Sequence, residues 1–163
     1  FNKLTFEQKK KYKIFFVGNG TKSELTKLDN QIKKYELQKY FKRIGYIRED
    51  SLTVLKNFDI FYSLTRDFEG FGYSIAESLF ASVPVVSTNV GGIPEYLNNK
   101  NATLVRPRDI NAISNTMVNF LKKKKIFIQK SKLGKSLISK KYNLNVMSDN
   151  YLKYFLRSSN EIK

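Results

Sequence analysis

A pair of glycines between an apolar run and an amphipathic stretch constrains the fold of this chain most. The apolar run, residues 58–64, is typical of a buried strand, and the amphipathic stretch that ends near Ser82 is typical of a helix. Between them lies Glu69-Gly70-Phe71-Gly72-Tyr73-Ser74-Ile75-Ala76-Glu77. Glycine lets the backbone of a strand-to-helix turn approach a ligand closely. The sequence therefore predicts a βα unit with a candidate ligand-binding turn.

The chemistry of this turn favours a phosphate ligand. The N–H groups of Gly72, Tyr73 and Ser74 are expected to point out of the helix N-terminus, which attracts phosphate through its unpaired donors and its dipole. Glu69 lies in the turn, and Glu77 lies about a turn and a half into the helix. Two carboxylates that flank a phosphate site suit a ligand with phosphate in the middle and hydroxyls at both ends, such as a nucleotide sugar.

A simpler interpretation is that the two glycines only make a tight connection and that both glutamates are solvated. A lone Gly-x-Gly would favour this simpler interpretation. The following residues, Pro84-Val85-Val86-Ser87-Thr88-Asn89-Val90-Gly91-Gly92-Ile93-Pro94-Glu95, supply a second strand and a second glycine turn. Both turns are expected at the same end of a parallel sheet, which is where ligands bind in open α/β sheets.

The rest of the chain alternates between strand and helix patterns, which predicts a doubly wound, parallel, Rossmann-like α/β sheet. We expect one domain over residues 1–163, with residues 1–11 as the end of a preceding helix. The expected strands are 12–17, 41–44, 59–64, 83–88 and 102–105, and the expected helices are 23–40, 52–57, 93–97, 110–121, 126–140 and 144–156. Gly18 and Gly20 form a further turn, which is either a loop close to the ligand or an ordinary βα turn.

Composition excludes several kinds of chemistry. The chain has no cysteine and no histidine, so disulfides, thiolate metal sites, imidazole ligands and His-activated nucleophiles are ruled out. No apolar run is long enough to span a bilayer. The net charge of +16 fits nucleic acid, anionic lipid or an anionic substrate as a partner, or a merely solvated lysine-rich surface. No nucleic-acid recognition motif accompanies the lysines, so we expect no nucleic-acid partner.

The two glycine turns and the glutamate pair with seven residues between together resemble the donor-binding domain of retaining GT-B glycosyltransferases, in the group 1 set, family four. The resemblance runs from about residue 12 to about residue 154. It implies metal-independent retaining transfer from a nucleotide diphosphate sugar, with no other cofactor, in bacterial polysaccharide or glycoconjugate synthesis. A GT-B sugar-nucleotide epimerase or a glycogen-synthase-like enzyme shares the fold and stays an alternative, and a basic nucleic-acid-binding module is a third.

The resemblance also implies roles for single residues. Glu69 would bind hydroxyls of the donor sugar near the reacting carbon, and Glu77 would accept hydrogen bonds from both ribose hydroxyls. Phe71 and Gly72 would present backbone amides to sugar or phosphate, beside Tyr73 and Ser74 at the helix start. Tyr46 would border the base. Phe71 has an alternative role as a core side chain, and the Tyr46 ring an alternative role in packing.

The sequence departs from the family pattern in three places. Residues 1–11 contain lysines but no Arg-x-x-x-x-Lys-Gly pattern. Leu64-Thr65 replaces the usual Pro-Ser before the turn at residues 69–72, which we call the central turn. The N-terminal acceptor-binding domain of the family is also expected to be absent from these residues. Because the chain also begins with Phe, we expect an excerpt of a two-domain cytoplasmic enzyme that is inactive alone, with an anionic membrane surface as a further candidate partner.

Overall fold

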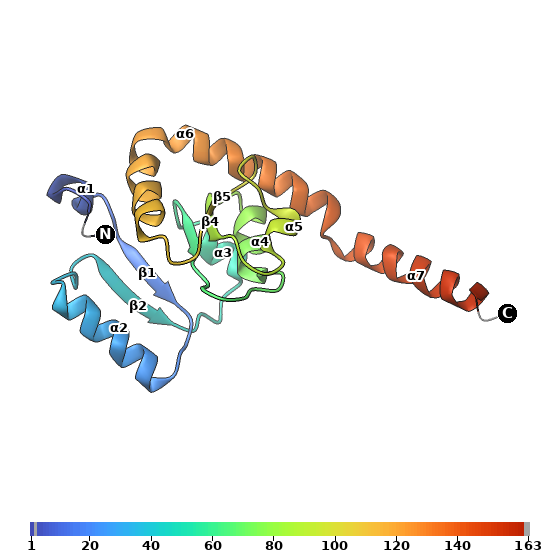
Figure 1. Ribbon diagram of the computed structural model, residues 1–163, viewed down its shortest axis with the longest axis horizontal. Coiled ribbons are helices and arrows are strands. Elements are labelled where there is room, and N and C mark those ends of the chain that lie inside the picture. Colours follow the sequence, from blue (N-terminus) through green and yellow to red (C-terminus); the bar gives the residue numbers. More distant parts are fainter. Residues whose placement is uncertain (2, 162–163) are drawn as a thin grey trace.

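Strands and helices alternate along residue 1 and residues 3–161, the part of the chain that the computed structural model describes (Figure 1). The elements in chain order are α1 (Phe6–Lys10), β1 (Ile14–Val17), α2 (Lys22–Lys34), β2 (Phe41–Gly45), α3 (Ser51–Leu55), β3 (Phe61–Ser63), α4 (Tyr73–Phe80), β4 (Val85–Thr88), α5 (Ile93–Tyr96), β5 (Thr103–Val105), α6 (Ile110–Lys141) and α7 (Leu144–Glu161). Every strand pairing among these residues is parallel, which confirms the predicted α/β class.

The strands form two hydrogen-bonded ladders where the sequence predicted one sheet. The first ladder has the order β1-β2 and the second the order β3-β4-β5. Side-chain packing connects the ladders: Ile14 of β1 and Tyr62 of β3 both pack against a buried cluster that contains Tyr12. Figure 1 shows β1 between β2 and the second ladder. The chain therefore leaves β1 toward one side and β3 toward the other, which creates a topological switch point between them.

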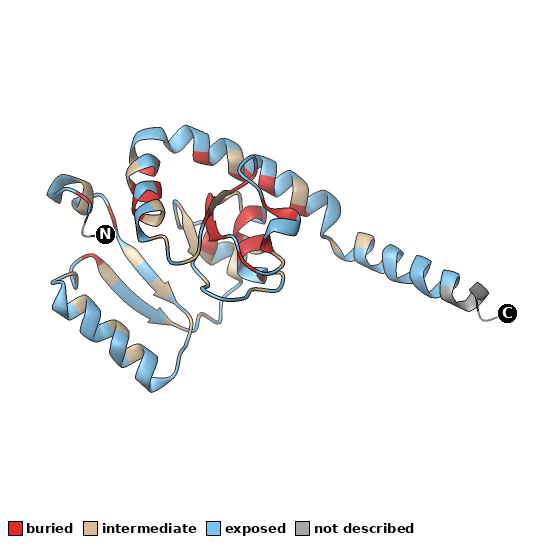
Figure 2. Cartoon of the chain, in the orientation of Figure 1, coloured by how far each residue is buried: buried red, intermediate tan, exposed pale blue. Residues whose placement is uncertain are grey.

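The core lies around the second ladder. Every residue of β4 is buried, and Leu79 of α4 and Ile93 of α5 have no exposed surface. Figure 2 shows this burial concentrated in β4, α4, α5 and the facing side of α6. Helix α6 packs closely on α4 at Gly134, where an added Cβ would lie 2.6 Å from Leu79 Cδ2. The core thus fixes the start of α4 relative to β4 and α5.

The first ladder is covered more thinly, and its helix α2 buries no residue completely (Figure 2). The predicted extension of this helix to residue 40 is wrong, because α2 ends at Lys34. Glu36 takes a left-handed φ of 53°, and the Leu37 N–H donates to the Ile32 carbonyl at 2.9 Å. This pattern is a Schellman ending, in which a left-handed residue reverses the chain and satisfies the last carbonyls.

The C-terminal third of the chain is helical. The two predicted helices at 110–121 and 126–140 are the two arms of α6, which meet at a kink where Lys123 leaves helical geometry. Helix α7 projects away from the body (Figure 1) and exposes Leu144, Met147, Tyr151 and Phe155. Within residues 1 and 3–161, no helix is both long enough and apolar enough to cross a membrane.

Candidate functional site

The glycine turns follow the carboxyl ends of the strands, as the parallel order requires. The Gly18–Gly20 segment follows β1, residues 64–72 follow β3, and residues 89–92 follow β4. The loops after β1 and β3 flank the switch point between the two ladders. In doubly wound folds this crevice is the usual ligand site, so the candidate site residues lie where the topology favours binding.

The loop before α4 is held by a hydrogen bond from the neighbouring strand. Thr88 Oγ1, at the end of β4, donates to the Thr65 carbonyl at 2.6 Å. Thr65 Oγ1 in turn lies 3.5 Å from Glu69 Oε2, a long contact that leaves the carboxylate free for stronger partners. Glu69 is half-buried, so its side chain is both positioned and accessible.

Gly72 begins α4 in a conformation that favours glycine. Its φ is 71° and its ψ is 70°, and no side chain caps the helix. An added Cβ would lie 2.9 Å from Ile75 Cδ1 and 3.3 Å from Ile93 Cδ1. The residues that follow, Tyr73 and Ser74, are exposed. The first N–H groups of a helix have no intrahelical acceptor, so this uncapped start offers donors to an anion.

Glu77 lies one turn after Tyr73 on α4 and is half-buried. Ser78, the next residue, is fully buried, and its hydroxyl donates to the Ser74 carbonyl at 2.7 Å. The other face of α4 packs into the core, where Ile75, Ala76 and Leu79 are buried. Glu77 therefore lies near the boundary between the core-facing side of the helix and solvent.

The Gly91–Gly92 turn contacts the backbone of the central turn directly. The Gly92 N–H donates to the Glu69 carbonyl at 2.9 Å. An added Cβ on Gly91 would lie 2.1 Å from the Glu69 carbonyl oxygen, and one on Gly92 would lie 2.4 Å from the Gly70 carbonyl oxygen. Only glycine allows this approach of two main chains. The sequence predicted both turns at one end of the sheet, and these contacts confirm that for the turns after β3 and β4.

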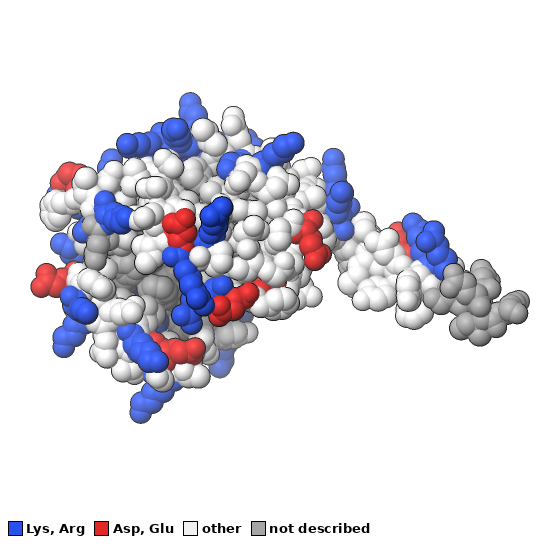
Figure 3. All heavy atoms as spheres, viewed as in Figure 1, with Lys and Arg blue, Asp and Glu red and all other residues white. Residues whose placement is uncertain are grey.

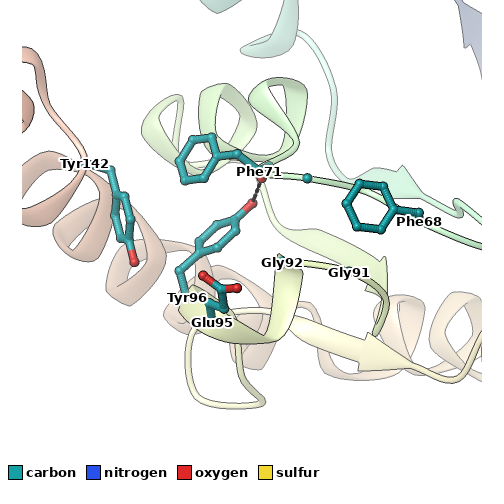
Figure 4. Close-up of a pocket in the computed structure, with 8 residues that line it drawn as sticks. Phe68, Phe71, Gly91, Gly92, Glu95, Tyr96 and Tyr142 are labelled. Carbon is teal, nitrogen blue, oxygen red and sulfur yellow. Dashed lines mark hydrogen bonds between the residues drawn. The ribbon is translucent and has the colours of Figure 1, made fainter.

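An aromatic cluster that sequence reasoning missed supports the same turn (Figure 4). The Tyr96 hydroxyl donates to the Phe71 carbonyl at 2.5 Å, and the two rings stack with centroids 4.9 Å apart. Tyr142, which ends α6, lies 5.4 Å from Phe71 and 5.6 Å from Tyr96 between ring centroids. Burial raises the pKa of the Tyr96 hydroxyl, and the negative charge of Glu69 raises it further. In the sequence, the only sign of this role is that Tyr96 is an aromatic residue shortly after the second glycine turn.

This cluster lines an open hollow of about 530 Å³. Its lining residues are Phe68, Gly70, Phe71, Gly91, Gly92, Glu95, Tyr96 and Tyr142. The stacked position of Phe71 agrees with the alternative that its side chain is a core residue, since Phe71 also packs against the main buried cluster. The carbonyl of Phe71 is used by Tyr96, so the backbone amides remain the groups that this turn offers to a ligand.

The remaining predicted site residues form a second group at the end of the first ladder. The Gly18 N–H donates to the Gly45 carbonyl at 2.7 Å, which holds the Gly18–Gly20 turn beside the start of the Tyr46 loop. A groove of about 270 Å³ includes Gly18, Gly20 and Arg43 in its lining. The Tyr46 ring is 71% exposed, which does not fit its alternative role in packing. Within the described residues, the structure gives no direct bond between this group and the group around Glu69.

Metal-binding side chains are not grouped in the described ranges 1 and 3–161, where no set of three or more Asp and Glu residues is placed to hold an ion. Charge in the loops is mostly exposed instead. Arg108 Nη2, which follows β5, lies 3.0 Å from Asp67 Oδ1 in the loop before Glu69, with both side chains largely exposed. Such a surface pair contributes roughly 0–1 kcal/mol to the free energy of unfolding. It therefore restrains the position of the loop more than it stabilises the fold.

Comparison with known proteins gives a consistent family. Residues 1–140 match the family described as glycosyl transferases group 1. The chain is 30% identical over 105 residues to the 2-deoxystreptamine N-acetyl-D-glucosaminyltransferase of Niallia circulans, which covers 64% of this chain and 26% of that protein. It is 29% identical over 102 residues to the phosphatidylinositol N-acetylglucosaminyltransferase gpi3 subunit of Schizosaccharomyces pombe, which covers 63% of this chain and 22% of that protein.

Solved structures have the same fold. Anabaena Alr3699/HepE in complex with UDP superposes with a TM-score of 0.79 at 20% identity, covering 91% of this chain and 41% of that chain. The C-terminal domain of a glycosyl transferase group 1 family protein (LpcC) from Francisella tularensis superposes with a TM-score of 0.69 at 20% identity, covering 85% of this chain and 92% of that domain. The chain thus spans about a quarter of the curated relatives it matches and nearly the whole of a solved C-terminal domain.

Proposed function

We propose that this chain, which belongs to the glycosyl transferases of group 1, is the half of a two-domain enzyme that binds a nucleotide diphosphate sugar. The observation that carries the proposal is the uncapped, glycine-started helix α4, with Glu69 before it and Glu77 within it, beside the switch point of the sheet. The diphosphate would lie against the N–H groups of Gly72, Tyr73 and Ser74. Glu69 would face the sugar, and Glu77 would bind the ribose.

The proposed chemistry is retaining transfer of the sugar. The leaving diphosphate carries negative charge, and amides that already point at it stabilise that charge without reorganising. Glu69 would bind sugar hydroxyls and lie near the reacting carbon. There its carboxylate would stabilise the positive charge of an oxocarbenium-like transition state. In the proposed metal-independent transfer, the helix start and basic side chains would compensate the charge of the diphosphate.

The second group of site residues, at the end of the first ladder, would receive the nucleoside. The Gly18–Gly20 turn and the Tyr46 loop are held together by the bond between the Gly18 N–H and the Gly45 carbonyl. The exposed Tyr46 ring is available to border a base. A nucleotide that reaches from this group to Glu77 would cross the switch point between the two ladders, which supports a ligand site shared by both.

The proposed partners follow from exposed surfaces. An acceptor-binding domain is a proposed partner, and it would cover the apolar side chains of α7, including Leu144, Met147 and Phe155. Figure 3 shows lysine and arginine side chains spread over the visible face among fewer acidic ones, and the net charge is +16. This charge supports the proposal of a cytoplasmic protein held at an anionic leaflet. Duplex DNA should bind only weakly and with steep salt dependence. A nanomolar, sequence-selective DNA complex at physiological salt would favour the nucleic-acid alternative.

The decisive experiment is a calorimetric titration of the chain with the monophosphates and diphosphates of uridine, guanosine and adenosine and with the sugar forms of the diphosphates. We expect one base to be preferred and the diphosphate to bind more tightly than the monophosphate. A folded chain that binds none of these compounds at millimolar concentration would contradict the proposal. In the intact enzyme, polysaccharide or glycoconjugate synthesis requires an acceptor. Conversion of the sugar nucleotide without any acceptor would favour the epimerase alternative.

A further inference from the structure

The orientation of the amides in the central turn depends on two bonds from one neighbouring segment. The peptide groups between residues 69 and 70 and between residues 71 and 72 are trans, like every peptide bond in the described residues. In a trans peptide the carbonyl and the following N–H point in opposite directions. A bond that fixes one carbonyl therefore also fixes the direction of the next amide.

Both carbonyls are fixed from the segment that contains the second glycine turn and α5. The Gly92 N–H holds the Glu69 carbonyl at 2.9 Å, and the Tyr96 hydroxyl holds the Phe71 carbonyl at 2.5 Å. Because both carbonyls point toward this segment, the N–H groups of Gly70 and Gly72 point away from it. Two amides of one turn are thereby directed away from Gly92 and Tyr96, which are labelled in Figure 4.

Gly72 makes the second bond necessary. A glycine populates left-handed and right-handed backbone conformations with similar ease. The peptide between Phe71 and Gly72 is therefore free to rotate unless something holds it. The Tyr96 hydroxyl is the group that holds its carbonyl, and the Tyr96 ring is itself kept in place because it is 5% exposed and packed against Phe71 and Tyr142.

We propose that Tyr96 is a positioning residue, which fixes the Gly72 N–H in the direction needed to bind the donor diphosphate. This inference deepens the proposed function and rests on it for the identity of the ligand. The hydroxyl acts through the Phe71 carbonyl and does not touch the ligand. Tyr142, at the end of α6, backs the Tyr96 ring and so connects the C-terminal helices to the turn.

The test compares Tyr96→Phe with a matched control, Tyr12→Phe. Tyr12 is also buried, at 8% exposure, and its hydroxyl also donates to a main-chain carbonyl, that of Met117 at 2.7 Å. Each variant loses one oxygen atom and one bond of the same kind, so their melting temperatures should fall alike. The proposal differs from a structural role in predicting that only Tyr96→Phe changes the Gly72 amide and the binding of nucleotide.

Two measurements are made on the wild type and both variants. Residual dipolar couplings report the direction of the Gly72 N–H vector, and titration reports affinity for the nucleoside diphosphate that the wild type prefers. We expect Tyr96→Phe to change the Gly72 coupling and to weaken binding by about three- to tenfold, the range for loss of one neutral hydrogen bond. Tyr12→Phe should leave the Gly72 coupling unchanged and alter affinity by less than about twofold.

The outcomes separate the two proposals. An unchanged Gly72 coupling in folded Tyr96→Phe overturns the positioning role, whatever the nucleotide does. A changed coupling in a protein whose wild type binds no nucleoside diphosphate supports the positioning role and removes the proposed function. The wild-type coupling is a test that needs no variant, because a Gly72 N–H vector directed toward the Tyr96 ring also overturns the inference.

Discussion

The main chain of Gly91 lies so close to that of Glu69 that a methyl group on Gly91 would come within 2.1 Å of the Glu69 carbonyl oxygen. Gly91 also has a left-handed φ of 55°. This contact joins the loop after β4 to the loop after β3 without any side chain. The geometry of the central turn is therefore set by backbone packing.

Replacement of Gly91 by alanine should be strongly destabilising. The left-handed φ and the forced overlap together should cost about 2–4 kcal/mol of unfolding free energy. Gly70→Ala is the matched control, because Gly70 lies in the same contact region with nothing within 4 Å of an added Cβ. It should change stability by less than about 0.5 kcal/mol. Denaturant unfolding of both variants measures the difference, and equal losses would contradict this account.

Replacement of Gly134 by alanine tests the contact between α6 and α4. Alanine gains about 1 kcal/mol of helix propensity over glycine, but its Cβ would lie 2.6 Å from Leu79 Cδ2 and 3.0 Å from the Asn101 carbonyl oxygen. Overpacking costs about 1–3 kcal/mol, so the net effect should be a loss. Ser136→Ala, at an exposed position of the same helix, should be neutral or slightly stabilising. A stabilised Gly134→Ala would show that the contact relaxes freely.

The two glutamates should behave differently on mutation. Glu77→Ala should weaken nucleoside diphosphate binding by roughly ten- to a hundredfold, because hydrogen bonds to a charged group contribute about 1.5–3 kcal/mol. Glu69→Ala should barely change that affinity and should depress turnover of the intact enzyme, since Glu69 is proposed to face the sugar. Titration with the diphosphate and with its sugar form measures both. Unchanged diphosphate binding by Glu77→Ala would remove the ribose assignment.

Stability should fall at alkaline pH through Tyr62, whose hydroxyl is part-buried. Burial raises the pKa of the Tyr62 hydroxyl to about 12, above the value of roughly 10 for an unfolded tyrosine. The folded state thus holds this proton more tightly, and its stabilisation is complete below pH 10 and is lost as pH rises toward 12. The contribution has a slope of about 1.4 kcal/mol per pH unit in that window.

Denaturant unfolding of wild type and Tyr62→Phe between pH 9 and pH 12 checks this prediction, and comparing the two curves cancels the titration of the lysines. Tyr62→Phe should show the shallower pH dependence. Tyr46→Phe, with its exposed ring, should follow the wild-type curve. Parallel curves for Tyr62→Phe and wild type would exclude a contribution from this hydroxyl.

The basic surface should bind anionic vesicles. Each lysine or arginine near such a surface contributes about 1 kcal/mol, and the chain carries 30 of them against 14 acidic residues. We expect sedimentation with phosphatidylserine vesicles at low salt, release at high salt, and no sedimentation with neutral phosphatidylcholine vesicles. Equal partitioning onto both kinds of vesicle would show that charge does not direct the chain to membranes.

Sequence reasoning succeeded where a local pattern determines the structure. The apolar run through Val85 and Val86 predicts a strand, and β4 is observed there, buried throughout. Gly72 was expected at the start of a helix, and it has the left-handed φ that favours glycine. The end of α2 was missed because Glu36, a residue without the usual glycine signal, takes the left-handed conformation there.

The support of the central turn was not predictable from local pattern. The bond from Tyr96 to Phe71 joins residues 25 positions apart, and an aromatic residue on a short helix usually indicates only core packing. Tyr142 comes from the end of α6, still farther along the chain. The separation into two ladders was missed for the same reason. Whether β1 and β3 pair depends on their distance in the folded chain, which has no local signature in the sequence.

The two ladders have a consequence for how the molecule opens. No hydrogen bond of the strand pairings joins β1 to β3, so each ladder can exchange its amide hydrogens in its own opening event. The first ladder, with few buried residues (Figure 2), should exchange faster than the second. A nucleotide bound across the switch point would touch both units and slow exchange in both. The ligand would then connect β1 and β3, which no strand pairing joins, and couple the opening of the two ladders.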